Sequence, residues 1–362
     1  MLLHEIGITL IPGVGDINGR KLISHCGGVE AVFKEKREAL LKIPGIGSAT
    51  VNSIVSQSVL KRAEEEIAFI EKHNISPLFY LDKSYPRRLS HCADSPMMVY
   101  YKGSADINSE RVVSIVGTRR ATDYGRRICN EIVEELATIN VLVVSGLAYG
   151  IDTCAHKAAL KNNIDTLGVL AHGLDRLYPA DNRNLAKEMG KQGGLLNEFL
   201  SKTNPDRENF PKRNRIVAGL ADAVIVIESA ARGGALITAG IANSYNRDVF
   251  AVPGKLNDKY SEGCNMLVKT NRAALIQSAA DVILMMQWQP ESKKPSKQRK
   301  LFVELSADEE KIVEILKEKE GVHIDNIVMK SGFTGSKIAA LLLNLEFEGV
   351  VVSLPGKMYR LN

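Results

Sequence analysis

The sequence predicts an α/β protein: a Rossmann-like, doubly wound and mostly parallel sheet, preceded by a helical domain and followed by a winged-helix-like domain. Three observations support this prediction. Short apolar runs alternate with helical segments in the middle of the chain, a Pro-Gly turn is repeated near the start, and three helical segments precede a hairpin pattern at the end. The predicted domains span residues 1–75, 76–288 and 304–362, with a basic linker at 289–303.

The predicted strands of the central domain are short, β-branched and continuously apolar. Such strands are buried on both faces, as in a parallel sheet covered by helices. A plausible helix follows each one, which favours a doubly wound arrangement. The runs are 112–117, 141–146, 166–171, 194–199, 223–229 and 249–254.

The repeated turn is "IPGVG" at 11–15 and "IPGIG" at 43–47, each followed by an amphipathic stretch. This pattern is typical of a helix-hairpin-helix or SAM-like domain. Glycine turns expose backbone N–H groups at a helix start, where they can hold a phosphate without reading sequence. A turn that needs glycine only for steric reasons explains the pattern equally well.

The end of the chain predicts helices at 307–319, 323–330 and 334–348, then two strands around a Pro-Gly-Lys turn in "VVSLPGKMYRL". This is the winged-helix order. The third helix has one Lys and two Glu, so a partner-binding or structural role is favoured over DNA recognition.

The net charge of +5 over 362 residues is a weak signal for nucleic acid, because residues 290–300 alone contribute +4. No run of eighteen apolar residues and no secretion signal are present, so a cytoplasmic protein without a membrane partner is expected. The five cysteines are scattered and form no C-x-x-C pair, which predicts reduced, mostly buried thiols and no metal or cofactor.

The ligand site of a doubly wound sheet lies beyond the carboxyl ends of the strands. The loops predicted there are rich in glycine, arginine and hydroxyl residues and lead directly into helices, which is typical of anion-binding loops. They are 117–125, 145–152, 171–179, 208–215, 228–240 and 253–265. A P-loop motif is absent, and "GTRR" replaces the G-x-G-x-x-G of dinucleotide-binding loops.

A hydrolase would need an acid/base pair in this crevice. Asp152 and His156 share a helix face, and Glu198 and Glu228 end two strands. Structural roles are favoured for all four residues: Asp152 as a helix N-cap, His156 as its neighbour, and the two glutamates paired with arginine or loop N–H groups.

The segment "FPKRNRIVAGL" at 210–220 places three cations in the first turn of a helix that starts at Pro211, where the helix dipole disfavours them. On a helical wheel Arg213 falls on the apolar face, so we expect it to point into the pocket. Its expected counter-ion is Glu198, Glu228 or a phosphate. Lys212 and Arg215 are expected on the exposed side, as outward guides for a polyanion.

Six ordered motifs between about residues 80 and 285 resemble the DNA-processing protein A (DprA/Smf) family, and the flanking domains resemble that family's usual extensions. The motifs are "SYPRRLSHCADSPMMVYYKG", "VSIVGTRRATDYG", "VVSGLAYGIDTCAHKAAL", "GLDRLYPADNRNLA", "FPKRNRIVAGLADAVIVIESAARGGALITAG" and "VFAVPG" with "SEGCNMLV".

The resemblance implies a non-enzymatic protein that binds single-stranded DNA without sequence preference. It implies a homodimer, with a self-association surface at about 255–285, that helps load RecA recombinase onto DNA covered by single-strand-binding protein during natural transformation. The loop positions and the family pattern together predict a DNA site at Gly117, Thr118, Arg119, Arg120, Gly146, Phe210, Lys212, Arg213, Asn214, Arg215, Arg232, Gly233 and Gly234.

Two alternatives stay open. The same pocket could serve a nucleotide sensor or a hydrolase similar to the LOG-type phosphoribohydrolases, which have a P-G-G-x-G-T-x-x-E loop. The matching stretch, "ARGGALITAG", keeps the glycine pair but has apolar residues in place of the glutamate, which favours binding over hydrolysis. The basic run at 290–300 could also supply most of the DNA affinity.

Overall fold

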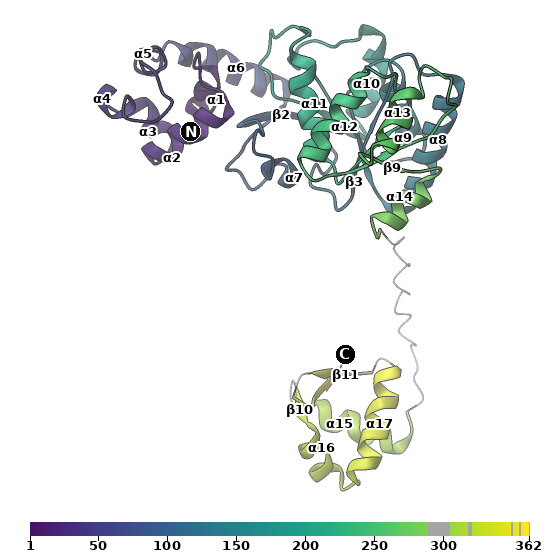
Figure 1. Cartoon of the computed structure of the whole chain (residues 1–362). Coiled ribbons are helices and arrows are strands. Elements are labelled where there is room, and N and C mark those ends of the chain that lie inside the picture. The colour runs from purple at the N-terminus through teal and green to yellow at the C-terminus, as the bar shows by residue number, and fades with distance from the viewer. Residues whose placement is uncertain (289–304, 318–320, 349, 355, 362) are drawn as a thin grey trace. The chain divides into compact units, whose positions relative to one another are not determined.

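The structure, a computed structural model, describes residues 1–288, 305–317, 321–348, 350–354 and 356–361, in two compact units spanning 1–290 and 291–362. The larger unit combines a helical N-terminal region with an α/β body (Figure 1). The whole of the predicted linker at 289–303 lies outside the described residues. Among the described helices, none has the length and apolar character needed to cross a membrane.

The α/β body contains a nine-stranded sheet in the order β1-β2-β6-β5-β4-β3-β7-β8-β9. The strands are β1 (Ser76–Phe79), β2 (Met98–Gly103), β3 (Val112–Val116), β4 (Leu142–Ser145), β5 (Thr166–Val169), β6 (Gly193–Asn197), β7 (Ala223–Val226), β8 (Asp248–Ala251) and β9 (Ala274–Leu275). All six predicted strands are therefore confirmed. The stretch from β6 to β9 is parallel, whereas β1 and β2 form an antiparallel edge that the sequence pattern did not reveal.

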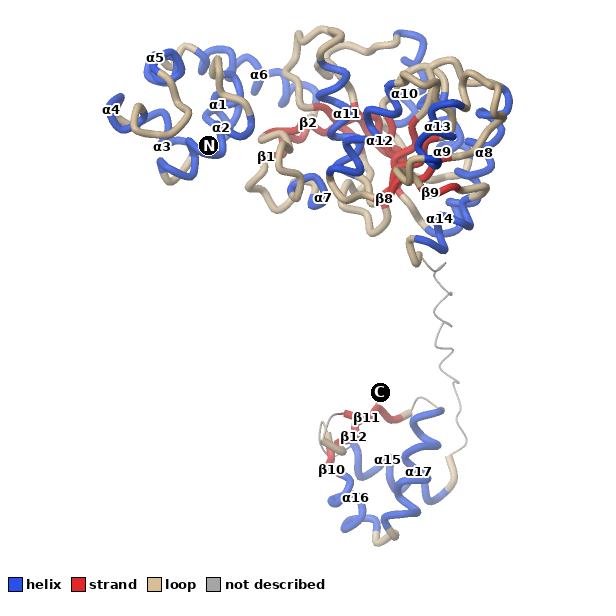
Figure 2. The backbone as a smooth tube through the Cα atoms, viewed as in Figure 1, coloured by secondary structure: helices blue, strands red, loops and turns tan. Residues whose placement is uncertain are grey.

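Helices cover both faces of this sheet (Figure 2). They are α7 (Arg87–Ser90), α8 (Asp123–Leu136), α9 (Ile151–Lys161), α10 (Arg183–Met189), α11 (Asn209–Leu220), α12 (Gly234–Ser244), α13 (Glu262–Lys269) and α14 (Ala279–Met285), with 3-10 turns at Ala137–Ile139 and Ala180–Asn182. Val112 and Val116 pack in the core under α11 and α12, while Val113 and Ile115 pack in the core under α8 and α9. Burial on both faces explains why these strands are continuously apolar.

The N-terminal region consists of α1 (Leu2–Leu10), α2 (Asp16–Cys26), α3 (Val29–Lys34), α4 (Arg37–Leu40), α5 (Ser48–Ser56) and α6 (Val59–His73). The two repeated turns adopt the same conformation. Gly13 and Gly45 have φ of 79° and 85°, which favours glycine, and Gly15 and Gly47 precede α2 and α5. The core of this region extends to Phe79 and Tyr100 of β1 and β2, so the boundary predicted at residue 75 stays a prediction.

The smaller unit has the predicted winged-helix order. Its helices and strands are α15 (Ala307–Lys317), β10 (Val322–His323), α16 (Ile324–Ser331), α17 (Gly335–Phe347), β11 (Val351–Leu354) and β12 (Met358–Leu361). The strands pair antiparallel in the order β10-β12-β11. A separate core that includes Ile312, Ile338 and Leu342 holds the three helices together.

Candidate nucleic-acid interface

A pocket of about 620 Å³ opens at the carboxyl ends of β3 and β7. These two strands are neighbours in the sheet, with Val116 opposite Val226, although more than a hundred residues separate them. From β3 the chain builds the sheet outward on one side through β4, β5 and β6, and from β7 it builds the other side. The pocket therefore lies where the strand order reverses, as predicted for a doubly wound sheet.

The loop after β3 forms one wall of the pocket. A Cβ on Gly117 would lie only 2.5 Å from Ile151 of α9, so this position needs a glycine. The loop is fixed by backbone bonds from Thr118 N to Glu228 O (2.8 Å) and from Ile151 N to Thr118 O (3.2 Å). Arg119 extends from this rigid loop into the pocket, is exposed, and has no ion-pair partner among the described residues.

Arg213 reaches the pocket from α11 and is buried, with only 6% of its side chain exposed. Its Nη1 lies 3.9 Å from Oδ2 of Asp152, which also accepts hydrogen bonds from Gly146 N (3.2 Å) and Ala148 N (3.4 Å). Burial raises the pKa of the Asp152 carboxyl, although the Arg213 charge opposes this shift. The Nε atom of Arg213 has no hydrogen-bond partner within the described chain, so this guanidinium retains a donor.

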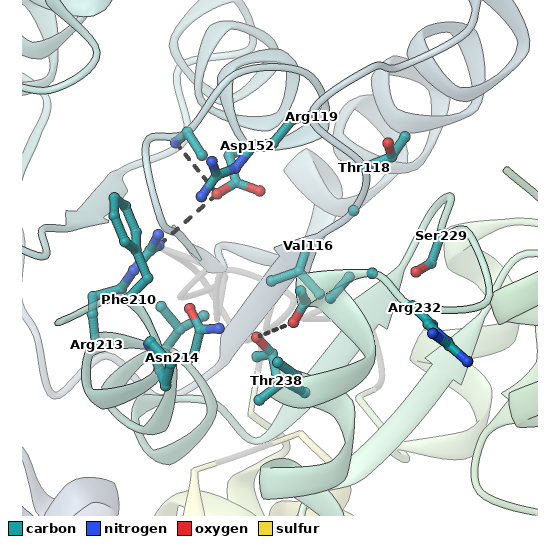
Figure 3. A pocket seen from close by; sticks show the side chains of 18 of the residues that line it. Val116, Thr118, Arg119, Asp152, Phe210, Arg213, Asn214, Ser229, Arg232 and Thr238 are labelled. Carbon is teal, nitrogen blue, oxygen red and sulfur yellow. Dashed lines mark hydrogen bonds and ion pairs between the residues drawn. The ribbon is translucent and has the colours of Figure 1, made fainter. Parts of the chain in front are cut away.

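Phe210 lies between the two arginines. Its ring centroid is 5.1 Å from the guanidinium carbon of Arg119 and 6.0 Å from that of Arg213, both within the range of cation–π contacts. The ring of Tyr178 meets it edge-on at 6.1 Å. Figure 3 shows Phe210 beside Arg213, with Arg119 and Asp152 close by.

The glycine-rich loop after β7 forms the opposite wall, where Figure 3 shows Ser229 and Arg232. This loop leads into α12, whose N-cap residue, Gly233, offers no side-chain cap. A Cβ on Gly234 would meet nothing within 4 Å, so the start of α12 is open toward the pocket. Unsatisfied N–H groups at a helix start favour an anionic ligand.

Most of the predicted site residues line this pocket: Gly117, Thr118, Arg119, Phe210, Arg213, Asn214, Arg232, Gly233 and Gly234. Gly146 lines a small adjoining cavity, where it lies against Arg213. Arg120 is exposed and does not line the pocket, although it follows Arg119 directly. Lys212 and Arg215 face a different cavity, on the side of α11 toward the N-terminal helices.

Three expectations about the segment 210–220 were wrong. The helix begins at Asn209, so Pro211 is its third residue. The carboxylate that pairs with Arg213 is Asp152 rather than Glu198 or Glu228, while a phosphate counter-ion stays a prediction. Arg215 is not an outward guide: its side chain is 13% exposed and pairs with Glu198 and with Asp16 of α2, the latter at 3.1 Å.

The acid/base candidates mostly have structural roles. His156 is fully buried beside the Thr166 hydroxyl (2.6 Å), and burial lowers its pKa to about 3. Glu228 accepts hydrogen bonds from the backbone and hydroxyl of Thr122 (3.0 and 2.5 Å), and Glu198 pairs with Arg215. Asp152 does not cap α9, whose N-cap is Gly150; its carboxylate instead reaches back to the loop after β4.

Sequence reasoning missed several residues that line the pocket, among them Pro205, Arg207, Ser229 and Thr238. Arg207 belongs to the basic cluster at 207–215, which was the available signal. The other three lie in loops or a helix start whose orientation depends on tertiary packing.

Comparison with known proteins identifies the family. The model of DNA recombination-mediator protein A matches residues 76–287, and that of the DprA winged helix domain matches residues 295–357. The chain belongs to the DprA/Smf family. It is 32% identical to Protein Smf of Synechocystis sp. over 97% of this chain and 96% of that protein. It is 40% identical to the DNA processing protein DprA of Streptococcus pneumoniae over 56% of this chain and 71% of that protein.

Solved DprA structures share the fold. The X-ray structure of DprA from Streptococcus pneumoniae matches with a TM-score of 0.69 and 31% identity, covering 80% of this chain and 99% of that one. The DprA of Helicobacter pylori matches with a TM-score of 0.54 and 29% identity. Its structure was reported for the single-stranded DNA binding mode of that protein. That match covers 59% of this chain and 97% of the other.

Proposed function

We propose that the pocket between β3 and β7 binds single-stranded DNA without sequence preference. The observation that carries this proposal is the group formed by Arg119, Phe210 and Arg213, which faces an uncapped helix start across the pocket. An aromatic ring can stack on any base, and guanidinium and N–H groups bind phosphate oxygens regardless of sequence. The single-stranded DNA binding of the Helicobacter pylori relative supports the same conclusion.

The pocket favours binding over catalysis. Among the described residues that line it, Asp152 is the one acid, and its carboxylate already contacts Arg213 and two backbone N–H groups. A general base must be free to take a proton from a substrate. We therefore infer a binding protein rather than a hydrolase.

The decisive test measures the affinity for a fluorescent oligo-dT. Arg119→Ala removes an exposed cation and should weaken binding about tenfold, because a charged contact contributes roughly 1.5 kcal/mol or more. Arg120→Ala is the matched control: it removes a neighbouring cation that lies outside the pocket, and its effect should be much smaller. Equal effects of the two substitutions, or unchanged affinity in both, would contradict the pocket assignment.

Salt dependence provides an independent check of the same proposal. The logarithm of the affinity should fall with the logarithm of salt concentration at a slope of about 0.7 per neutralised phosphate, and Arg119→Ala should reduce that slope. An affinity that is independent of salt would rule out backbone contacts as its main source.

We further propose that the protein forms a homodimer. In this form it helps load RecA onto DNA covered by single-strand-binding protein during natural transformation. Exposed apolar side chains within 255–285 support the dimer: Leu256, Met266, Leu275, Leu284 and Met285 are 87%, 41%, 44%, 76% and 50% exposed. Leu284→Glu should shift the protein toward monomers in sedimentation velocity.

The RecA-loading step is tested by RecA filament formation on DNA covered by single-strand-binding protein. The rate of ATP hydrolysis by RecA reports this filament formation.

A small nucleotide is the second candidate ligand, because a pocket of about 620 Å³ is of the size that holds one. Thermal stabilisation by micromolar nucleoside monophosphate, or release of its base, would favour this reading. Stabilisation by oligo-dT alone would favour the DNA-binding proposal.

A further inference from the structure

Glu66 of α6 is a buried carboxylate in the N-terminal region, with 2% of the residue exposed. It accepts hydrogen bonds from the backbone N–H of Ser201 (2.9 Å), from the Ser201 hydroxyl (2.5 Å) and from Arg62 (2.8 Å). Arg62 in turn donates to Ser201 O at 2.7 Å. Glu66 and Arg62 thus bind both polar backbone groups of one residue in a loop 135 positions away.

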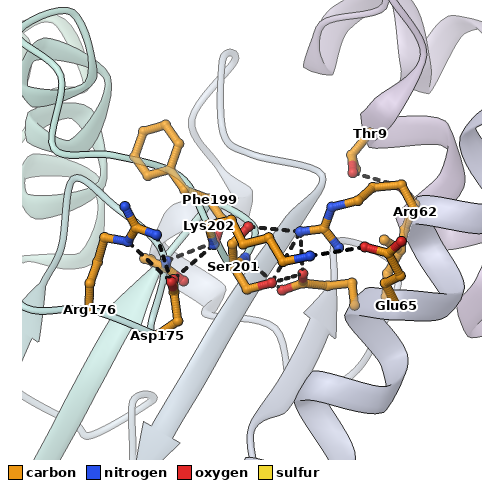
Figure 4. Close-up of polar contacts among 11 residues, drawn as sticks. Thr9, Arg62, Glu65, Asp175, Arg176, Phe199, Ser201 and Lys202 are labelled. Carbon is orange, nitrogen blue, oxygen red and sulfur yellow. Dashed lines mark hydrogen bonds and ion pairs between the residues drawn. The ribbon is translucent and has the colours of Figure 1, made fainter.

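This loop, residues 198–208, joins β6 to α11. Its backbone is held in an uncommon conformation at Lys202, where φ is 70° in a residue other than glycine. Asp175 accepts a hydrogen bond from Lys202 N (2.9 Å), and the Lys202 side chain pairs with Glu65 of α6 (3.1 Å). Figure 4 shows these contacts converging on the loop from α6 on one side and from Asp175 on the other. Such a conformation persists only where its surroundings enforce it.

The far end of the same loop belongs to the pocket. Pro205 and Arg207 line it, and Asn209, the first residue of α11, donates to Asn204 O at 3.1 Å. Phe210 and Arg213 follow directly on α11. The pocket-lining residues all lie between positions 116 and 238, so the N-terminal helices have no direct part in its wall.

We propose that Glu66 is a positioning residue for the DNA pocket: it fixes the loop 198–208 from outside and thereby sets where Arg207, Phe210 and the start of α11 lie. The N-terminal region would then control DNA affinity without lining the pocket. This inference rests on the proposed DNA-binding function. A buried ion pair often adds little net stability, whereas it can specify one geometry, which agrees with a positioning role.

The test measures oligo-dT affinity for Glu66→Ala, Glu66→Gln and Ser201→Ala in the full-length protein, well below each melting temperature. We expect Glu66→Ala to weaken binding about fivefold, and the other two to weaken it less, because they keep part of the network. Glu64→Ala is the matched control: it removes an exposed carboxylate from the same helix and should leave the affinity unchanged.

Two further measurements separate positioning from a general loss of stability. Trypsin should cut more rapidly after Lys202 or Arg207 in Glu66→Ala than in Glu64→Ala. Phe210→Ala removes the ring that Glu66 helps to position, so the two substitutions should not act independently. In a double-mutant cycle, the affinity loss of the double variant should therefore be smaller than the sum of the losses of Glu66→Ala and Phe210→Ala. If Glu66→Ala does not fold, Ser201→Ala carries the same comparison.

Wild-type affinity in folded Glu66→Ala and Ser201→Ala, or fully additive losses with Phe210→Ala, would overturn the positioning role. The Arg119→Ala variant separates a failure of the positioning role from a failure of DNA binding at the pocket. If it loses affinity while the Glu66 and Ser201 variants do not, the pocket binds DNA and only the positioning role fails. If it too binds normally, the proposed function itself fails.

Discussion

Gly146 lies directly against the buried Arg213 guanidinium, and a Cβ at this position would overlap its Nη1 atom. The glycine therefore permits an arginine to pass beneath the loop after β4 and enter the pocket. Arg213 pairs there with Asp152 at 3.9 Å, while its Nε atom has no hydrogen-bond partner among the residues that the structure describes. A buried cation beside a pocket, with one N–H group that lacks a hydrogen-bond acceptor, favours binding of an anion there.

We expect Gly146→Ala to lower both stability and DNA affinity, since the new methyl group displaces Arg213; overpacking of this kind costs about 2 kcal/mol. Gly234→Ala is a contrasting variant, because its Cβ would meet nothing within 4 Å in the protein but would lie at the ligand side of α12. It should reduce affinity while leaving the melting temperature nearly unchanged. Thermal unfolding and oligo-dT titration of both variants check this, and equal melting temperatures for the two would contradict it.

Helix α11 has different partners on its two sides. Arg213 faces the pocket between β3 and β7, and Arg215, two residues later, faces α2 and the end of β6. Two residues advance the helix by about 200°, so one short element reaches two separate polar environments. Asp16 of α2 contacts Arg215 within α11, and Glu66 of α6 contacts Ser201 in the preceding loop, so both the helix and the loop before it contact the N-terminal helices.

Glu198, directly after β6, is a buried carboxyl that pairs with Arg215 of α11. Burial raises the pKa of its carboxyl to about 7, although Arg215 beside it opposes the shift. The folded protein therefore holds this proton more tightly than the unfolded chain does, and this residue's contribution to stability falls as pH rises from about 4.5 to 7.

Glu198→Gln should remove this pH dependence. Relative to the variant, wild type should lose up to about 3 kcal/mol of unfolding free energy between pH 4.5 and pH 7, with little further change above. Urea denaturation of both proteins across this range gives the difference directly. A difference that stays constant with pH would show that Glu198 ionises normally in the folded state.

The molecule consists of two compact units, and each has its own hydrophobic core. The described pocket is formed by residues 116–238 of the larger unit. In the winged-helix unit, α17 exposes Leu343 (54%) and Phe347 (83%), which fits a protein-binding role better than DNA recognition. That role stays a prediction.

Deleting residues 289–362 should therefore leave oligo-dT affinity within about twofold of wild type, a change too small to reflect the loss of one charged contact. The deletion also removes the basic run at 290–300, so it tests whether that run supplies the affinity. A drop of tenfold or more would move the main DNA contacts from the pocket to the C-terminal part of the chain.

Continuous apolar runs were sufficient to predict every parallel strand from β3 to β8, because burial on both faces leaves a strong pattern. Strands β1, β2 and β9 escaped notice, since each is exposed along part or all of its length and lacks a continuous buried run. For the site, glycine and arginine in loops after strands indicated Arg119 and Gly233, which line the pocket; their contacts with DNA stay a prediction. Helical periodicity placed Arg213 inward but Arg215 outward, because the wheel does not include the N-terminal helix that covers Arg215.

The amino-acid sequence by itself determined the fold class, the family and the loops that line the pocket, because these depend on local patterns of apolar residues, glycine and charge. Only the tertiary structure decided which cations face the pocket and which carboxylate neutralises each one. Asp152 and Arg213, like Glu66 and Ser201, lie far apart in the chain and meet only when the sheet and the N-terminal helices pack. Their pairing depends on distance and burial, which no local pattern in the sequence encodes.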